Sequence, residues 1–167
     1  MATTHIMKPR MNADLVAAVA SVGIALAVGV IGALATAPNI TTWYAGLNKP
    51  GFSPPNGVFA PVWTTLYIVM ALAAWRVWRA GQSGRRIGWP LSLYAVQLGL
   101  NLGWSLIFFG LHQPGLALVE IGVLLVTIVI TTAVFWRIDR PAGAMMFPYI
   151  AWVAFASALN FEIWKLN

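Results

Sequence analysis

The stretch LVAAVASVGIALAVGVIGALATA, residues 15–37, decides what kind of fold this chain adopts, because it contains no charged side chain. A helix needs about 20 consecutive apolar residues to cross the hydrocarbon core of a bilayer. The stretch is too long for the apolar region of a secretory signal peptide and lacks a recognisable cleavage site. It therefore predicts a transmembrane α-helix.

The rest of the chain has the same apolar character. Hydrophobic residues make up 60% of the sequence and charged residues only 8%, against roughly 25% charged residues in soluble domains. Four more apolar segments are long enough, or nearly so, to span a bilayer: 58–75, 87–111, 116–136 and 142–164. We predict an all-α membrane protein, a five-transmembrane-helix bundle that forms one domain over residues 13–167. The polar segment 1–12 contains a second methionine, Met7, within its first ten residues, and we expect the segment to be disordered and to include a cloning remnant.

Prolines indicate where the helices begin and bend. Pro61, Pro90 and Pro114 are predicted to lie in first helical turns, where the missing N–H has no intrahelical partner to lose. Pro148 lies deeper in the fifth segment, and we expect it to bend that helix.

The basic residues predict the orientation of the spans. Five spans place Lys49 and Lys165 on one side of the membrane. They place the other basic residues on the opposite side: Lys8, Arg10, Arg76, Arg79, Arg85, Arg86, Arg137 and Arg140. Basic residues concentrate on the cytoplasmic side, so we expect a cytoplasmic N-terminus and an external first loop. Because these charges flank apolar segments and form no aromatic-interleaved basic cluster, we do not expect nucleic acid as a partner.

Small residues recur at every fourth position of the first span. They are Ala17, Ser21, Ala25, Gly29, Ala33 and Ala37, and this spacing places them on one ridge of a helix. Such a ridge lets another helix backbone approach closely. The pattern leaves two interpretations open, which are packing inside the bundle and a dimer interface.

The third span has two different faces. Gly99 and Gly103 form a GxxxG pair, which predicts close packing against a helix of the bundle or of a second subunit. The other face carries Tyr94, Gln97, Asn101, Trp104 and Phe108. A polar amide inside a bundle costs free energy unless it finds a partner. Gln97 and Asn101 therefore predict either hydrogen bonds to other helices or contact with a ligand.

The segment TTWYAGLNKPGFSPPNGVFAPVWTTLY, residues 41–67, begins with an unusually aromatic loop. Loops usually carry polar turn residues, but this one also carries Trp43, Tyr44, Phe52 and Phe59. Aromatic residues at the ends of spans commonly anchor a protein at the headgroups. The alternative interpretation is that the loop covers a cavity.

The sequence offers few groups for catalysis or metal binding. It contains no cysteine, and its two histidines, His5 and His112, lie outside the spans. We therefore expect no catalytic residue and no metal ligand. Glu120 lies about two turns into the fourth span, where a carboxylate costs roughly 2.5–3.5 kcal/mol. A structural hydrogen bond and a proton-coupling role are both open for it.

Four stretches of the sequence resemble the TspO/MBR family, which is also called the translocator protein or peripheral benzodiazepine receptor family. They are WYAGLNKPGFSPPNGVFAPVWTTLY, QLGLNLGWSLIFFG, PGLALVE and FPYIAWVAFASALNFEIWKLN, in this order within the five spans. The resemblance covers residues 29–167 and implies a five-helix membrane bundle, commonly a homodimer. It also implies binding of porphyrins such as protoporphyrin IX, of sterols and of synthetic ligands, with no required cofactor. A bacterial member would lie in the cell membrane.

The resemblance further implies a ligand cavity near the first loop. Its candidate residues are Trp43, Leu47 and Asn48 from the loop, Trp63 from the second span, Asn101 and Trp104 from the third, and Trp152, Phe155, Ala156 and Leu159 from the fifth. Lys49 is a candidate partner for a tetrapyrrole propionate. Phe161 replaces the tyrosine of the family's sterol-recognition pattern, which argues against cholesterol binding.

These features lead us to expect a membrane receptor, sensor or carrier that binds porphyrin or haem-like tetrapyrroles and related apolar ligands. Two alternatives stay open. One is an enzyme that degrades porphyrin in a light-dependent reaction, with Trp63 and Trp152 as redox or radical participants. The other is a proton-coupled exporter of small molecules that uses Glu120.

Overall fold

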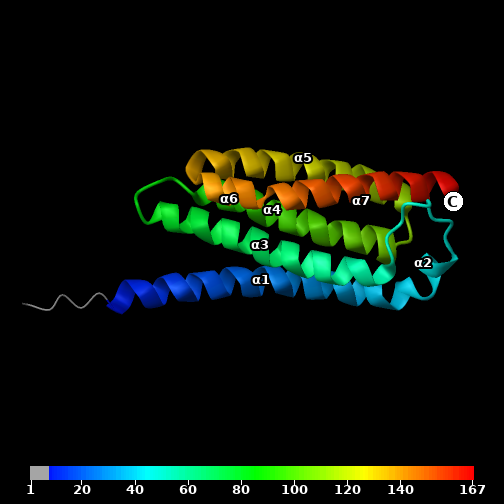
Figure 1. Ribbon diagram of the computed structural model, residues 1–167, viewed down its shortest axis with the longest axis horizontal. Helices are drawn as coiled ribbons and strands as arrows, with labels where there is room; N and C mark the ends of the chain where they lie inside the picture. The colour runs from blue at the N-terminus through cyan, green and yellow to red at the C-terminus, as the bar shows by residue number, and fades with distance from the viewer. Residues whose placement is uncertain (1–7) are drawn as a thin grey trace, which may run out of the picture.

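The computed structural model describes residues 8–167, and these residues form helices joined by short loops (Figure 1). The helices are α1 (Lys8–Ile40), α2 (Trp43–Gly46), α3 (Asn56–Gly81), α4 (Gly88–Ser105), the π-helical segment η1 (Leu106–Gly110), α5 (Pro114–Ile138), α6 (Arg140–Met145) and α7 (Phe147–Leu166). No strand occurs among residues 8–167. The predicted all-α fold class is therefore confirmed.

Five helical segments of the described chain are long and apolar enough to cross a membrane. They are Ala13–Ile40, Asn56–Gly81, Gly88–Gly110, Pro114–Ile138 and Arg140–Leu166. Each overlaps one predicted span, which confirms a multi-pass membrane protein. Helix α1 begins at Lys8, before the predicted start of the domain at residue 13. Residues 1–7, for which disorder was also predicted, lie outside the described residues.

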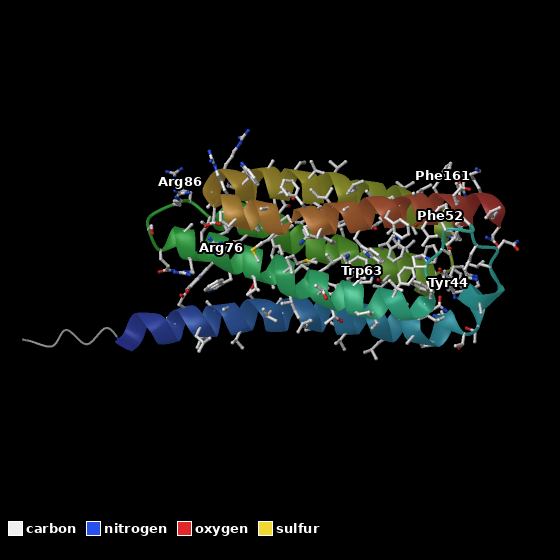
Figure 2. All side chains as sticks on the ribbon, viewed as in Figure 1. Tyr44, Phe52, Trp63, Arg76, Arg86 and Phe161 are labelled. Atoms are coloured by element: carbon white, nitrogen blue, oxygen red, sulfur yellow. The ribbon has the colours of Figure 1, made fainter. Side chains whose placement is uncertain are left out.

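The five spans run side by side as an elongated bundle (Figure 1). Helix α1 packs against α3 and α4, while α5 packs against α4, α6 and α7. Helix α3 packs closely against α1 and α6 but only sparsely against α7. Figure 2 shows Arg76 and Arg86 at one end of the bundle, and Tyr44, Phe52 and Phe161 at the other. We call these the basic end and the loop end.

Two prolines refine the predicted helix boundaries. The fifth span is divided, because α6 ends at Met145 and α7 begins at Phe147, with Pro148 in the first turn of α7. The bend predicted near Pro148 thus takes the form of a helix break, since proline lacks the N–H that a continuous helix needs. The first-turn position predicted for Pro61 is wrong, because α3 already begins at Asn56.

Asp139 joins α3 to the turn between α5 and α6. One carboxylate oxygen accepts the Ala142 N–H at 2.8 Å and thereby caps α6. Both oxygens accept from the Arg76 guanidinium, at 2.9 Å from Nε and 3.1 Å from Nη2. These hydrogen bonds from Arg76 hold the pKa of the Asp139 carboxyl below its ordinary value. The basic end is therefore fastened by a bidentate ion pair and a helix cap that share one carboxylate.

The ridge of small residues on α1 packs inside the bundle from Ser21 to Gly29, whereas Ala33 and Ala37 are exposed. Ser21 Oγ donates to the carbonyl of Ala71 on α3 at 2.8 Å, and Ala25 is completely buried. At Gly29 the α3 helix approaches so closely that a Cβ atom would lie 2.7 Å from Cε2 of Tyr67. These contacts favour bundle packing over a dimer interface for the ridge.

The two glycines of the GxxxG pair on α4 have different surroundings. A Cβ atom at Gly103 would lie 3.6 Å from the Glu120 carboxylate of α5, so α5 is the helix that packs against this glycine. Gly99 is exposed, and a Cβ atom there would meet nothing within 4 Å.

The close approach at Gly29 predicts a large difference between two glycine substitutions in α1. We expect Gly29→Ala to lower the free energy of unfolding by about 1–3 kcal/mol, because overpacking displaces a buried tyrosine. The matched control is Gly23→Ala, where a Cβ atom meets nothing within 4 Å. Thermal unfolding of both variants in detergent measures the difference, and equal midpoints would contradict the packing described for α1 and α3.

The two roles of Asp139 can be separated by substitution. Asp139→Asn keeps a good cap but loses the ion pair, and we expect a cost of at most about 1 kcal/mol because the pair is partly exposed. Asp139→Ala also loses the cap and costs about 0.5–2 kcal/mol more. Denaturant unfolding with Glu162→Gln as the exposed-pair control tests this order.

The same ion pair predicts a pH dependence. Because the pKa of Asp139 is lowered in the folded state, its stabilisation is fully present above about pH 4, the ordinary Asp pKa. The stabilisation is lost as the pH falls through the lower folded-state pKa. We expect Asp139→Asn to reduce the loss of stability in this acidic range, measured as the unfolding midpoint against pH. An unchanged profile would show that the pair contributes nothing.

Candidate ligand-binding cavity

A cavity of about 410 Å³ lies inside the bundle near its loop end. Side chains from α1, α2, α3, α4, η1 and α7 line it. Six of the predicted site residues are among them: Trp63, Asn101, Trp104, Trp152, Ala156 and Leu159. Small-molecule sites commonly measure about 300–1,000 Å³. The structure therefore brings most of the predicted residues together around a hollow of useful size.

Asn101 forms the inner boundary of the cavity, on the side away from the first loop. Its Oδ1 accepts a hydrogen bond from the Tyr67 hydroxyl of α3, and its Nδ2 donates to the Tyr149 hydroxyl of α7 at 3.1 Å. All three side chains are buried. The helix-to-helix interpretation of Asn101 therefore holds, and the same side chain also lines the cavity.

Trp104 and Asn160 form the wall between α4 and α7. Trp104 Nε1 donates to Asn160 Oδ1 at 3.0 Å, and Asn160 Nδ2 donates to the carbonyl of Pro114 at 2.8 Å. The Trp104 ring stacks on Phe108 of η1, with centroids 5.1 Å apart. Asn160 was not predicted, although the argument applied to Asn101, that of a polar amide in an apolar span, would have found it.

Trp152 lines the cavity and carries a buried hydrogen-bond donor without a partner in the described chain. Its ring packs edge to face against Trp63, with centroids 6.4 Å apart, and against Phe59 at 5.7 Å. Its indole Nε1 is buried and has no partner within the described chain. An unpaired buried donor costs about 1–3 kcal/mol, so an acceptor atom of a ligand would gain most at this nitrogen.

The α1 side of the cavity is open to the surface. Ala33 and Ala37 on α1, and Ala60 and Thr64 on α3, line the cavity but are themselves exposed. All four lie within membrane-spanning segments. The cavity therefore opens sideways, between α1 and α3, toward the bilayer.

The first loop covers the cavity through Tyr44. This residue is 5% exposed and lines the cavity, and burial raises the pKa of its hydroxyl. Lys49 Nζ lies 4.8 Å from the Tyr44 ring centroid and donates to the carbonyls of Ala45 and Leu47. The loop thus packs onto the bundle as a cover.

Trp43 and Leu47 do not line the cavity. They pack beside Tyr44 and support the first loop, which covers the cavity. Trp43 stacks on His112 with ring centroids 4.4 Å apart and packs edge-on against Phe108 at 5.5 Å. Leu47 is partly buried against the hydrophobic cluster that contains Tyr44 and Phe108.

Asn48 and Phe155 also lie outside the cavity. The Asn48 backbone N–H donates to Asn167 Oδ1 at 3.0 Å, and Asn167 Nδ2 donates back to the Asn48 carbonyl at 3.0 Å. Phe155 lies on the outer side of α7, where its ring packs against Phe52 of the loop at 6.2 Å. The loop is therefore fastened to α7 at two places.

Two other polar residues that the sequence singled out do not line the cavity. Gln97 is fully buried and its Nε2 donates to the sulfur of Met70 at 3.7 Å, which is a contact between helices. Both carboxylate oxygens of Glu120 are buried without a hydrogen-bond partner in the described chain, and Glu120 is absent from the cavity lining. Residues 8–167 contain no group of three side chains that could hold a metal ion.

Comparison with the sequences of known proteins identifies the family of this chain. The sequence model of the TspO/MBR family matches residues 21–165. The chain belongs to the TspO/MBR family.

Members of the TspO/MBR family from distant organisms resemble the chain over most of its length. The tryptophan-rich protein TspO of Chlorobaculum tepidum is 41% identical over 94% of this chain and 99% of its own length. The translocator protein of Bos taurus is 41% identical over 83% of each chain. The tryptophan-rich sensory protein of Cereibacter sphaeroides is 40% identical over 75% of this chain and 77% of its own.

The hydrogen bond between Tyr67 and Asn101 predicts a contrast between two buried tyrosines of this TspO/MBR protein. We expect Tyr67→Phe to lower the free energy of unfolding by about 1–3 kcal/mol, because it leaves the Asn101 carbonyl oxygen unpaired. Tyr94 is the matched control, since its buried hydroxyl has no partner among the described residues. Tyr94→Phe should be neutral or stabilising. Chemical unfolding in detergent, followed by tryptophan fluorescence, compares the two, and equal losses would refute the role of this bond.

Proposed function

We propose that the protein is a membrane receptor, sensor or carrier whose cavity binds porphyrins of the protoporphyrin IX type and related apolar ligands. Family membership, with relatives named translocator protein and tryptophan-rich sensory protein, supports the receptor or sensor part. The porphyrin part rests on one observation. Aromatic rings from α2, α3, α4, η1 and α7 line a cavity whose described lining has no charged side chain and one buried donor without a hydrogen-bond partner.

A flat apolar macrocycle suits this lining better than a polar solute does. Aromatic faces offer stacking area, and the Trp152 N–H and the side chains of Asn101 and Asn160 supply a few polar contacts. The cavity of about 410 Å³ is enlarged in effect by its opening between α1 and α3, where the edge of a larger ring can protrude. Propionate groups are costly to bury unpaired, so they would point to the loop end, where Lys49 and Lys165 lie.

The membrane setting is proposed on the same basis. The basic end, with Arg76, Arg86 and their neighbours, would face the cytoplasm of a bacterial cell, and the first loop would lie outside. We also propose a homodimer that uses the exposed face of α4 around Gly99, because Val96 on this helix is 53% exposed and Gly99 leaves room for close approach.

Porphyrin binding can be tested by titrating the purified protein with protoporphyrin IX in the dark and following the porphyrin absorption band. We expect saturable binding that Trp152→Ala weakens about tenfold, which corresponds to about 1.4 kcal/mol, because the substitution removes an aromatic wall and a donor. Trp89→Ala is the control, since Trp89 is 59% exposed and lies outside the cavity. Equal affinities of the wild type and Trp152→Ala would contradict the cavity as the porphyrin site.

Two further measurements, illumination of the titrated protein and a flux assay in vesicles, distinguish the two alternative functions. The adjacent rings of Trp63 and Trp152 favour the porphyrin-degrading enzyme as the second candidate. Illumination would then produce a new pigment band that is lost in Trp152→Phe. Coupled export by Glu120 instead requires a pH-dependent flux into vesicles that disappears in Glu120→Gln, although Glu120 does not line the cavity.

A further inference from the structure

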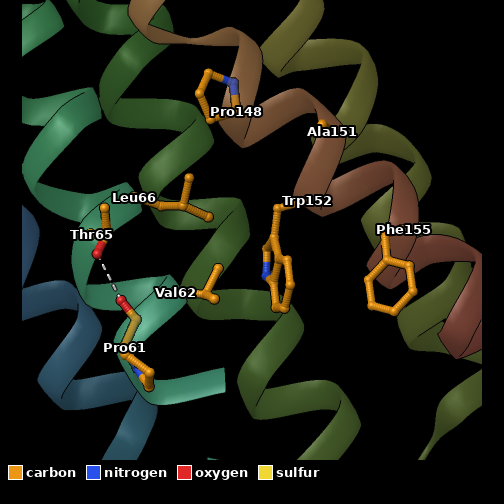
Figure 3. Close-up of a pocket in the computed structure, with 8 residues that line it drawn as sticks. All are labelled: Pro61, Val62, Thr65, Leu66, Pro148, Ala151, Trp152 and Phe155. Carbon is orange, nitrogen blue, oxygen red and sulfur yellow. Dashed lines mark hydrogen bonds between the residues drawn. The ribbon is translucent and has the colours of Figure 1, made fainter. Parts of the chain in front are cut away.

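A second hollow, which we call the outer groove, lies on the surface between α3 and α7 (Figure 3). It measures about 620 Å³. Its walls include Val62 and Leu66 on α3 and Ala151, Trp152 and Phe155 on α7. The groove exists because α3 packs only sparsely against α7. Trp152 is the one residue that lines both the outer groove and the inner cavity.

Among the described residues, none offers the outer groove a polar group that is free for a ligand. Thr65 is its one hydroxyl-bearing residue, and the Thr65 Oγ1 donates to the carbonyl of Pro61 at 2.9 Å, shown as the dashed line in Figure 3. The other side chains of the lining are apolar apart from the Trp152 indole nitrogen, which is buried. An occupant with a charge or an unpaired donor would lose its hydration without compensation here. The groove therefore suits a purely hydrocarbon guest.

The position of the outer groove identifies the source of such a guest. Both of its walls belong to membrane-spanning segments, Asn56–Gly81 and Arg140–Leu166. Along α7 the groove begins near Pro148 and ends at Phe155, whose ring packs against Phe52 of the first loop. The groove is therefore open sideways to the hydrocarbon core, while this aromatic contact lies at its loop end.

We propose that the outer groove binds one acyl chain of a bilayer phospholipid, with the chain lying against the outer face of Trp152. No hydrogen bond from a described residue fixes the indole. Its ring is positioned by packing against aromatic neighbours, with centroids 5.6 Å from Phe155, 5.7 Å from Phe59 and 6.4 Å from Trp63. An acyl chain in the groove therefore supports a wall of the inner cavity from outside. This site goes beyond the proposed porphyrin function and does not depend on it.

Fluorine NMR of protein labelled with fluorotryptophan, in lipid nanodiscs, tests the acyl-chain site. The protein has nine tryptophans, and Trp152→Phe assigns the Trp152 signal. Lipids that carry a spin label near the middle of one acyl chain should broaden the Trp152 signal strongly. They should broaden the Trp63 signal much less, because Trp63 lines only the inner cavity and its ring centroid lies 6.4 Å from that of Trp152.

Variants in which a larger side chain fills the outer groove are compared with the wild type in the same experiment. Ala151→Phe places a ring in the outer groove and should remove most of the broadening of Trp152. Val62→Phe fills the groove from α3 and should do the same if Ala151→Phe does not fold. Ala158→Phe is the control, because Ala158 is exposed two turns further along the same helix and lines neither hollow. It should leave the broadening unchanged.

Three results would overturn the acyl-chain site. The first is a Trp152 signal that the spin-labelled lipid does not broaden, which would show that no chain enters the groove. The second is equal broadening of both signals, which would place the chain in the inner cavity. The third is broadening of Trp152 that persists in the groove-filling variants. The samples contain no porphyrin, so failure of porphyrin binding leaves this test intact.

Discussion

The side-chain amide of Asn101 joins three of the five spans. It does so at the level where the packed part of the bundle ends and the cavity begins. It accepts from Tyr67 on α3 and donates to Tyr149 on α7. A bilayer offers no water to an exposed amide, so these partners must come from the protein. Toward the basic end, buried residues such as Met70 fill the space between the helices. Toward the loop end, the cavity begins.

The buried polar atoms of the cavity lining are therefore already hydrogen-bonded, with one exception among the described residues. Asn101 bonds to two tyrosine hydroxyls, and Asn160 bonds to the Trp104 indole and to the Pro114 carbonyl. These bonds fix the positions of α3, α4, α5 and α7. Such bonds hold the aromatic rings in place but offer a guest little new hydrogen bonding. The Trp152 indole nitrogen is the exception. Selectivity in this cavity must then come mainly from shape and stacking, with one directional contact.

The sequence predicted the features that depend on local pattern. Uninterrupted apolar length predicts the spans, and a fourfold period of small residues predicts the face of α1 that packs on α3, as at Gly29. Amide and aromatic residues at helical spacing predict that Asn101 and Trp104 share a face, and they line one cavity. These predictions succeed because a helix converts spacing along the chain directly into position in space.

The positions of the loop residues could not be predicted in this way. Asn48 is held by Asn167, a residue 119 positions later in the chain, so its place depends on how the whole bundle closes. Trp43 was assigned to the cavity, but its stacking on His112 places it beside the cover. Phe155 shares a helix face with Trp152 in sequence spacing, yet the separation of α3 from α7 leaves it outside. The spacing of residues along one helix does not show how far that helix lies from its neighbour.

That separation accounts for both hollows of the molecule. At the basic end, Asp139 binds Arg76 of α3 and caps α6, so α3 is fastened to the fifth span there. Further along, α3 packs on α1 and only sparsely on α7. The space between α3 and α7 is divided by the Trp152 ring into an inner cavity and an outer groove. Because one ring forms part of both walls, a shift of Trp152 that widens one hollow must narrow the other.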